Sequence, residues 1–222
     1  MWHDAVLVAG KDLRIEWRSR VGLNQVVPFA LVVLLLFGLA LGPDAAHLRL
    51  ATAGLFWVTV LLAALLAVQR SFAIESVDGA RDGLRLSGLD AGGIFVGKAA
   101  ALAVQLLVLE VVLALVAALL YTTPLTGIAL LAGSCVLATA GLAAVGTFYG
   151  AVAAGTRVRE TLLPLLFFPV VAPVLLAATK AWSAALGHAS GAGLGWLALL
   201  AVFSVAYVAI GTVAFGPLLE DG

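Results

Sequence analysis

Apolar residues run almost without interruption through six long segments of this chain, and polar positions gather in the short stretches between them. A helix that crosses a bilayer needs about 20 predominantly apolar residues. Six segments satisfy this requirement: residues 21–41, 50–69, 94–120, 126–152, 161–179 and 194–216. In lipid, a continuous apolar run of this length indicates a helix. The pattern predicts an all-α integral membrane protein, in which residues 21–222 form a domain of six transmembrane helices that run antiparallel through short connections.

The first 20 residues follow a different pattern and are too polar to span a membrane. Arranged as a helix, they separate apolar side chains from a stripe of cations. The apolar face holds Trp2, Val6, Leu13 and Trp17, and the cationic stripe holds Lys11, Arg14 and Arg18. Such a helix is suited to the headgroup layer, with tryptophans toward the lipid and cations near phosphates. Residues 1–20 are therefore predicted to form an interfacial amphipathic helix; the alternative is a frayed polar tail.

Composition agrees with a membrane location and excludes several kinds of site. Hydrophobic residues make up 64% of the 222 residues and charged residues 11%, against about 25% charged in a soluble domain. The formal net charge is zero, so nothing indicates binding to nucleic acid. The single cysteine, Cys135, allows neither an intrachain disulfide nor a thiolate metal site.

Positive charges predict the orientation of the spans. Ten of the 12 lysine and arginine residues fall before the first span or in the second and fourth connections, which share one side of the membrane. Only Arg49 and Lys180 fall on the other side. Because positive residues are retained in the cytoplasm, both termini and the connection over residues 70–98 are predicted to be cytoplasmic.

That second connection contains the most unusual stretch of the chain, ESVDGARDGLRLSGL, at residues 75–89. On a helical wheel its apolar face is Ile74, Val77, Ala80 and Leu84, and its charged side is Glu75, Asp78, Arg81, Asp82 and Arg85. Gly79 and Gly83 each cost about 1 kcal/mol relative to alanine, so this short helix would need a partner surface. The residues alone leave two readings open: a docking helix, or a solvated loop whose charges only set topology.

Residues 92–99, GGIFVGKA, nearly spell a phosphate-binding loop. Ala99 stands where the motif needs a serine or threonine hydroxyl for magnesium, and the segment opens a membrane helix rather than following a strand. We expect no nucleotide site here. Gly93 and Gly97 instead predict a close helix–helix contact, with Lys98 as an anchor at the membrane interface.

Glu110 is the only charge deep within a predicted span. A central acid costs about 2.5–3.5 kcal/mol on insertion, so its helix face should look inward. It is either a carboxylate in a substrate path or a partner in an interhelical hydrogen bond.

The fifth span holds three prolines, Pro164, Pro169 and Pro173, which predict a kinked or broken helix. Just before it, Gly146 and Gly150 predict that the fourth span is a close-packing surface. Two histidines, His47 and His188, fall in outer loops without a metal-ligand cluster; each is either an ordinary loop histidine or a haem ligand.

Three stretches carry a resemblance to a known family: KDLRIEWRSR, QRSFAIESVDGARDGLRLSGLDAGGIFVGK and GTFYGAVAAGTRVRETLLPLLFFPVVAPVLLAATKA. Together they resemble the membrane subunits of ABC-2 type exporters, and more narrowly the haem exporter protein B family, the permease subunits of the cytochrome c maturation transporter. The likeness covers essentially the whole chain. It departs from the family at Ser87-Gly88, where a proline is common.

The resemblance implies an ABC-2 type permease architecture in the bacterial cytoplasmic (inner) membrane and a non-catalytic subunit for haem export or delivery. A cytoplasmic ATP-binding subunit would bind ATP and magnesium, and a haem-handling membrane subunit would be a second partner. Haem would be the substrate of the complex rather than a cofactor bound by this chain.

The resemblance further implies that the loop over residues 70–98 couples to the ATPase. The coupling residues would be Ile74, Glu75, Val77, Asp78, Gly79, Arg81, Asp82, Leu84 and Arg85. Two other functions stay open: an exporter subunit for another amphipathic substrate, and a scaffold that joins the ATPase to the haem-handling subunit without transporting.

Overall fold

The computed structural model describes residues 1–19, 22–77, 88–154, 159–188 and 193–220, and these form helices joined by turns, without strands in the described part. The helices, in chain order, are α1 (Trp2–Ser19), α2 (Val27–Leu41), α3 (Ala45–Val77), α5 (Ala91–Leu120), α6 (Ile128–Ala154), α7 (Arg159–Ala185) and α8 (Gly193–Glu220). A π-helical turn, Gly22–Val26, leads into α2.

Six of these helices are long and apolar enough to cross a membrane. Their apolar stretches are Asn24–Leu41, Ala45–Ala73, Ala91–Leu120, Ile128–Ala154, Thr161–Ala185 and Gly193–Leu218. The predicted all-α architecture with six spans is confirmed. The main difference lies in α3, which starts five residues earlier than the predicted span and continues to Val77. The charged stretch that begins at Glu75 is therefore entered directly from a spanning helix, and its first residues do not begin a separate helix.

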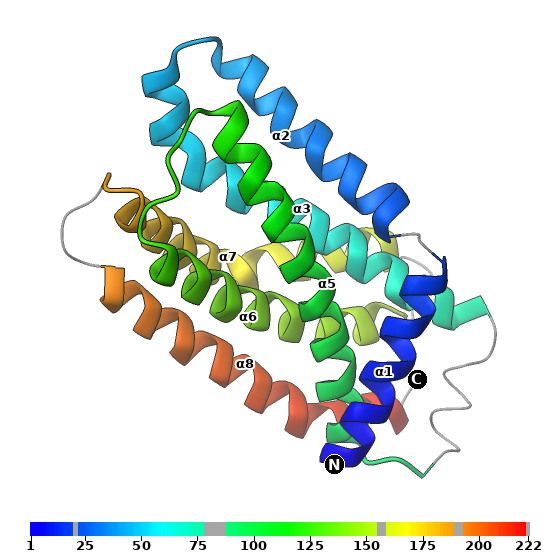
Figure 1. Ribbon diagram of the computed structural model, residues 1–222. Helices are drawn as coiled ribbons and strands as arrows, with labels where there is room; N and C mark the ends of the chain where they lie inside the picture. Colours follow the sequence, from blue (N-terminus) through cyan, green and yellow to red (C-terminus); the bar gives the residue numbers. More distant parts are fainter. Residues whose placement is uncertain (20–21, 78–87, 155–158, 189–192, 221–222) are drawn as a thin grey trace.

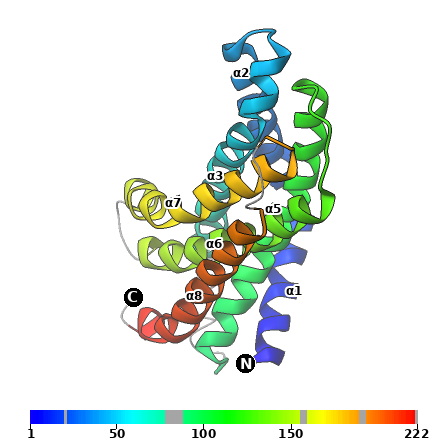
Figure 2. The same cartoon turned by 90° about the vertical axis from the view of Figure 1, so that its left-hand side faces the viewer.

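Successive spans run antiparallel, as the short connections predicted (Figure 1). The turns from α2 to α3 and from α5 to α6 lie at one end of the bundle, and α1 and the last turns of α8 lie at the other (Figure 1). Helix α6 packs against α3, α5, α7 and α8 and so occupies the centre. Helix α1 crosses the end of the bundle beside the first half of α5, and the two helices lie side by side in both views (Figures 1 and 2).

Polar side chains join the helices near the α5–α6 connection, at the end of the bundle opposite α1. The Tyr121 hydroxyl donates to the carbonyl oxygen of Leu34 on α2 over 2.6 Å. The hydroxyls of Thr52 on α3 and Thr123 lie 2.8 Å apart, and both residues are buried. Because a buried polar group costs free energy unless it is hydrogen-bonded, these bonds fix the α5–α6 connection against α2 and α3.

An aromatic cluster fills the core between α3 and α7. The rings of Phe56 and Trp182 stack with centroids 3.8 Å apart, and Trp57 meets both edge-on, at 5.3 and 6.0 Å. All three are at most 1% exposed. Aromatic pairs of this kind add to the free energy of area burial, so the cluster is a major source of contact between these two helices. Sequence spacing gave no sign that Trp57 and Trp182 would meet.

Glycines allow the closest approaches between the spans. At Gly146 an added Cβ would lie 2.6 Å from Val68, and at Gly150 it would overlap the Phe72 ring. The predicted close-packing surface on the fourth span is confirmed, and its partner is α3. On α8 an added Cβ at Gly211 would overlap the ring of Phe95 on α5, which is fully buried.

We predict that Gly211→Ala destabilises the protein although alanine favours helices. The new methyl group collides with the fully buried Phe95 ring, and overpacking of this kind costs about 1–3 kcal/mol. Thermal unfolding in detergent measures the effect. Gly54→Ala on α3 is the matched control, because nothing lies within 4 Å of its added Cβ; equal melting temperatures for the two variants would contradict the close packing.

Candidate functional site

Helix α1 docks on the first turns of α5 through the two glycines of the near-phosphate-loop segment. An added Cβ at Gly97 would lie 2.6 Å from the carbonyl oxygen of Ala5 and 2.8 Å from Cβ of Val8. At Gly93 it would lie 2.8 Å from the carbonyl oxygen of Met1. The predicted close helix contact is confirmed, and α1 is its partner. The glycines serve helix packing, since backbone of a second helix fills the space beside them.

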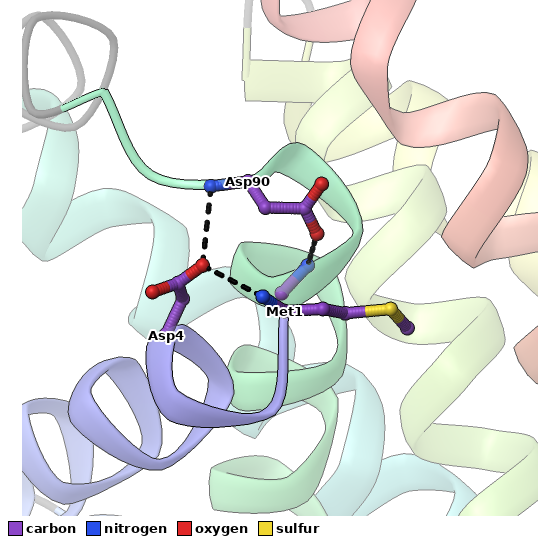
Figure 3. A network of polar contacts seen from close by, with 4 residues as sticks. Met1, Asp4 and Asp90 are labelled. Carbon is purple, nitrogen blue, oxygen red and sulfur yellow. Dashed lines mark hydrogen bonds and ion pairs between the residues drawn. The ribbon is translucent and has the colours of Figure 1, made fainter.

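A polar network joins the beginnings of the same two helices (Figure 3). The Asp90 carboxylate caps α5 by accepting a hydrogen bond from the backbone N–H of Gly93 over 2.7 Å. The backbone N–H of Asp90 donates in turn to Oδ2 of Asp4, 3.4 Å away, and the same oxygen accepts from the amino group of Met1 at 3.0 Å. The hydrogen bond from that amino group is the largest cause that lowers the pKa of Asp4. The residue that ends the charged connection is thus bonded directly to α1.

Lys98, which the sequence predicted to be an anchor at the membrane interface, is covered by α1. Its side chain is buried, with the ammonium 3.5 Å from Oδ2 of Asp12 on α1 and 5.5 Å from the ring centroid of Phe72 on α3. Asp12 also pairs with Lys11 at 3.1 Å. Because α1 covers this turn of α5, the ammonium contacts a carboxylate and a ring face of the protein. Lys98 consequently connects α1, α3 and α5. Its depth in the membrane stays a prediction.

The outward surface of α1 carries the side chains that the sequence assigned to lipid. Trp2 and Trp17 are 76% and 80% exposed, while Ala5 and Val8 face α5 and are buried. Arg14 and Arg18 are exposed, and Leu13 and Lys11 are half-buried. Within the described part of the chain, the helix therefore has a protein-facing side and an exposed aromatic side. Its placement in the headgroup layer stays a prediction.

Most of the predicted coupling residues are not described. Asp78, Gly79, Arg81, Asp82, Leu84 and Arg85 lie outside the described residues. Ile74, Glu75 and Val77 belong to the last turns of α3, and only their backbone is described. Both attachments of the stretch are described, however. On the α3 side Phe72 packs against Gly150 of α6 and Lys98 of α5, and on the α5 side Asp90 is bonded to α1.

Glu110 lies on the protein-facing side of α5 and is 2% exposed. The hydroxyl of Thr139 on α6 donates to its Oε1, and the thiol of Cys135 lies beside the carboxyl group. The interhelical hydrogen bond, one of the two alternatives for this residue, is present. Sequence reasoning missed Thr139 and Cys135; their i, i+4 spacing places both on one face of a helix, which was the available signal.

The three prolines of α7 do not break it, because one helix continues from Arg159 to Ala185. Pro169 is exposed, and Pro164 and Pro173 are half-buried, so none belongs to the buried core. The carbonyl oxygen of Val170 accepts a hydrogen bond from the Tyr207 hydroxyl on α8 over 2.7 Å. The prediction of a broken helix was therefore wrong, and a kink at these positions stays a prediction.

The outer-loop histidines lie on different connections. Nδ1 of His47 is 2.6 Å from Oδ2 of Asp44, and the pair is exposed at the start of α3. The pKa of Asp44 is lowered mainly by the hydrogen bond from the backbone N–H of Ala46, and next by the hydrogen bond with the His47 side chain. His188 is exposed at the end of the turn after α7. No group of three or more metal-ligating side chains occurs among the described residues.

Comparison with known proteins identifies relatives along most of the chain. The family model of the CcmB protein matches residues 4–221. Heme exporter protein B of Paracoccus denitrificans is 34% identical over 174 residues, which cover 77% of this chain and 78% of the relative. The protein of the same name from Pseudomonas aeruginosa is 30% identical over 200 residues, or 90% of each chain. A third, from Rhodobacter capsulatus, is 31% identical over 166 residues, covering 75% and 76%.

We predict that Gly97→Ala loosens α1 from α5. The added methyl group meets the backbone oxygen of Ala5, which cannot move without α1, and the strain costs about 1–3 kcal/mol. Hydrogen exchange should accelerate over α1 and stay unchanged over α6. Gly10→Ala on α1 is the control, since nothing lies within 4 Å of its added Cβ; slow exchange of α1 in both variants would show that the glycine is not needed for docking.

For Glu110 we predict that Glu110→Gln melts close to the wild type, because the amide oxygen still accepts from Thr139. Glu110→Ala and Thr139→Ala should each cost about 1–3 kcal/mol, because either one leaves a buried partner unsatisfied. The double variant should lose less than the sum of the two. Additive losses, measured by thermal unfolding in detergent, would mean that the two side chains do not act as a pair.

Proposed function

The chain belongs to the CcmB protein family, and from that membership we propose that it is the membrane permease subunit of a haem exporter that serves cytochrome c maturation. It is a multi-pass membrane protein with six spanning helices. The observation that carries the proposal is the family match over residues 4–221, which includes every described helix beyond the first turn of α1. Haem is the transported substrate in this proposal and not a resident cofactor.

The energy for export would come from a separate cytoplasmic ATP-binding subunit, which hydrolyses ATP and docks on residues 74–85. Support comes from the two attachments of this stretch. Force applied to it would reach α6 through the Phe72–Gly150 contact and α1 through the Asp90–Asp4 hydrogen bond. A docking segment tied at both ends to different helices is suited to convert movement of a partner into movement of the bundle.

The same proposal places the chain in the bacterial cytoplasmic (inner) membrane with both termini in the cytoplasm. Ten of the 12 lysine and arginine residues then fall on the cytoplasmic side. The arrangement in Figure 1, with α1 and the last turns of α8 at one end of the bundle, agrees with this topology. A haem-handling membrane subunit would be the second partner.

A scaffold without a transport path is the second candidate. One observation favours it: Glu110 is the buried acid within the described spans, and its carboxyl group is engaged by Thr139. An exporter for a charged substrate usually presents polar groups along its path. A scaffold would hold the ATPase beside the haem-handling subunit, and haem uptake into vesicles with and without ATP separates it from a carrier. The c-type cytochrome content of a deletion strain distinguishes a haem exporter from an ABC-2 type exporter of another amphipathic substrate, because only loss of the haem exporter would lower it.

We predict that the double charge reversal Asp78→Lys with Asp82→Lys abolishes restoration of c-type cytochromes in a deletion strain. In the proposed complex both carboxylates would face cationic groups of the ATPase. The two introduced lysines would repel those groups, and repulsion between like charges costs several kcal/mol across an interface. Co-purification of the ATP-binding subunit, measured by mass, should fall at least about tenfold. The amount of chain in the membrane should match that of the wild type.

Asp44→Lys is the matched control, because it reverses an exposed aspartate at the opposite end of the bundle. Wild-type ATPase recovery by the double variant would overturn the coupling assignment. Normal c-type cytochromes in the deletion strain itself would overturn the exporter function.

A further inference from the structure

A cluster of polar side chains lies inside the bundle, in the half away from α1 (Figure 1). Glu110 of α5, Cys135 of α6 and Trp182 of α7 meet there. Glu110 and Trp182 are 2% and 1% exposed. The Cys135 thiol lies beside both the Glu110 carboxyl group and the Trp182 indole. Three spans therefore contribute polar side chains to one buried place.

Two buried atoms of this cluster have no hydrogen-bond partner among the described residues. They are Oε2 of Glu110 and Nε1 of Trp182. Nε1 of Trp57, whose ring meets that of Trp182 edge-on, is also buried and without a partner in the described part of the chain. Buried polar groups are nearly always paired. An acceptor and a donor on either side of one thiol therefore indicate a ligand that both of them share.

The two side chains are held in place and cannot easily turn toward other partners. The hydroxyl of Thr139 donates to Oε1 of Glu110, which fixes the carboxyl group from one side. The Trp182 ring is stacked on Phe56, with centroids 3.8 Å apart and an angle of 17° between the planes. The Cys135 thiol is a weak donor and a weak acceptor, so it does not replace a full hydrogen-bond partner for either atom.

We propose that an internal water molecule bridges Glu110 and Trp182 beside Cys135. The water oxygen accepts the indole N–H of Trp182, and the water exchanges a second hydrogen bond with Oε2 of Glu110. Buried waters typically make about three hydrogen bonds to groups that the protein leaves unsatisfied. The bridge joins α7 to α5, whereas the main packing partners of α7 are α3, α6 and α8.

The chemistry of the two unpaired atoms favours water over other ligands. Water both donates and accepts, so it can pair with Oε2 of Glu110 whether the carboxyl group is charged or neutral. A metal ion is disfavoured, because an indole N–H only donates and the described residues contain no group of three or more metal-ligating side chains. An anion would lie against the carboxyl group, and an apolar molecule would leave both atoms unpaired.

Hydroxylation of aromatic rings during a brief X-ray pulse tests the proposal. The pulse converts water to hydroxyl radicals where the water lies, and mass spectrometry finds the rings that react. The full chain is used in lipid nanodiscs. We expect Trp182 to be hydroxylated at least about tenfold faster than the buried Phe95, after correction for the intrinsic reactivity of the two rings, because a bound water lies next to Trp182 alone. Radicals made only in the bulk solution should label the exposed Trp17 and leave Trp182 unlabelled.

Three variants assign the contact to Glu110. Glu110→Leu should lower hydroxylation of Trp182 about tenfold, because it removes a polar partner of the water. Glu110→Gln should keep the wild-type rate, since an amide also pairs with water. Ser204→Ala is the matched control. It removes a buried hydroxyl that donates to the carbonyl oxygen of Leu137, between α8 and α6, and it should leave the Trp182 rate unchanged. Circular dichroism and thermal melting show that each variant is folded.

The wild-type protein alone can overturn the proposal: hydroxylation of Trp182 at the rate of Phe95 would mean that the cluster is dry. Strong labelling of Trp182 by radicals from the bulk solution would mean that the place is open to solvent, and would also overturn it. A folded Glu110→Leu variant with the wild-type rate would remove Glu110 from the site. None of these measurements involves ATP or haem, so the exporter function is tested separately.

Discussion

Hydrocarbon accepts no hydrogen bonds, and this constraint governs the structure. Spanning segments form helices, which close most backbone hydrogen bonds internally, and several polar side chains at depth find partners on neighbouring helices. The Thr139 hydroxyl donates a hydrogen bond to Glu110. The carbonyl oxygens of Leu34 and Val170 accept hydrogen bonds from the hydroxyls of Tyr121 and Tyr207, respectively. These interhelical hydrogen bonds also hold particular helices next to each other. The need to satisfy buried polar groups therefore helps to determine the packing of the bundle.

The second organising feature is the attachment of α1. Glycines remove side-chain bulk where α1 meets α5, and the resulting close approach brings Asp12 to Lys98 and Asp4 to the capped start of α5. Close approach buries the Asp12–Lys98 pair away from water, and the lower dielectric constant strengthens the ion pair. A helix that composition alone describes as peripheral is thereby joined to the bundle on one side, while its tryptophans stay exposed on the other.

Sequence patterns predicted the spans because a bilayer imposes a minimum apolar length, which is visible in each segment separately. They also showed that Gly93 and Gly97 allow a close contact, but not that α1 provides it. The burial of Lys98 was missed for the same reason: position along a helix gives the distance from its end and does not show which helix covers that turn. The Glu110–Thr139 bond joins residues 29 apart, and no local rule pairs them. The coupling residues between 78 and 85 lie in a part of the chain that is not described, so their role rests on resemblance.

The Asp12–Lys98 pair also bears on how the protein is made. The two residues are 86 positions apart, so during synthesis α1 and the first two spans emerge before α5 does. A lysine in the first turns of an arriving helix is costly to bury alone, but here its carboxylate partner has already been synthesised. The order of the chain therefore supplies the counter-ion before the charge that needs it, and α5 can be inserted into a bundle that is ready to receive its N-terminal end.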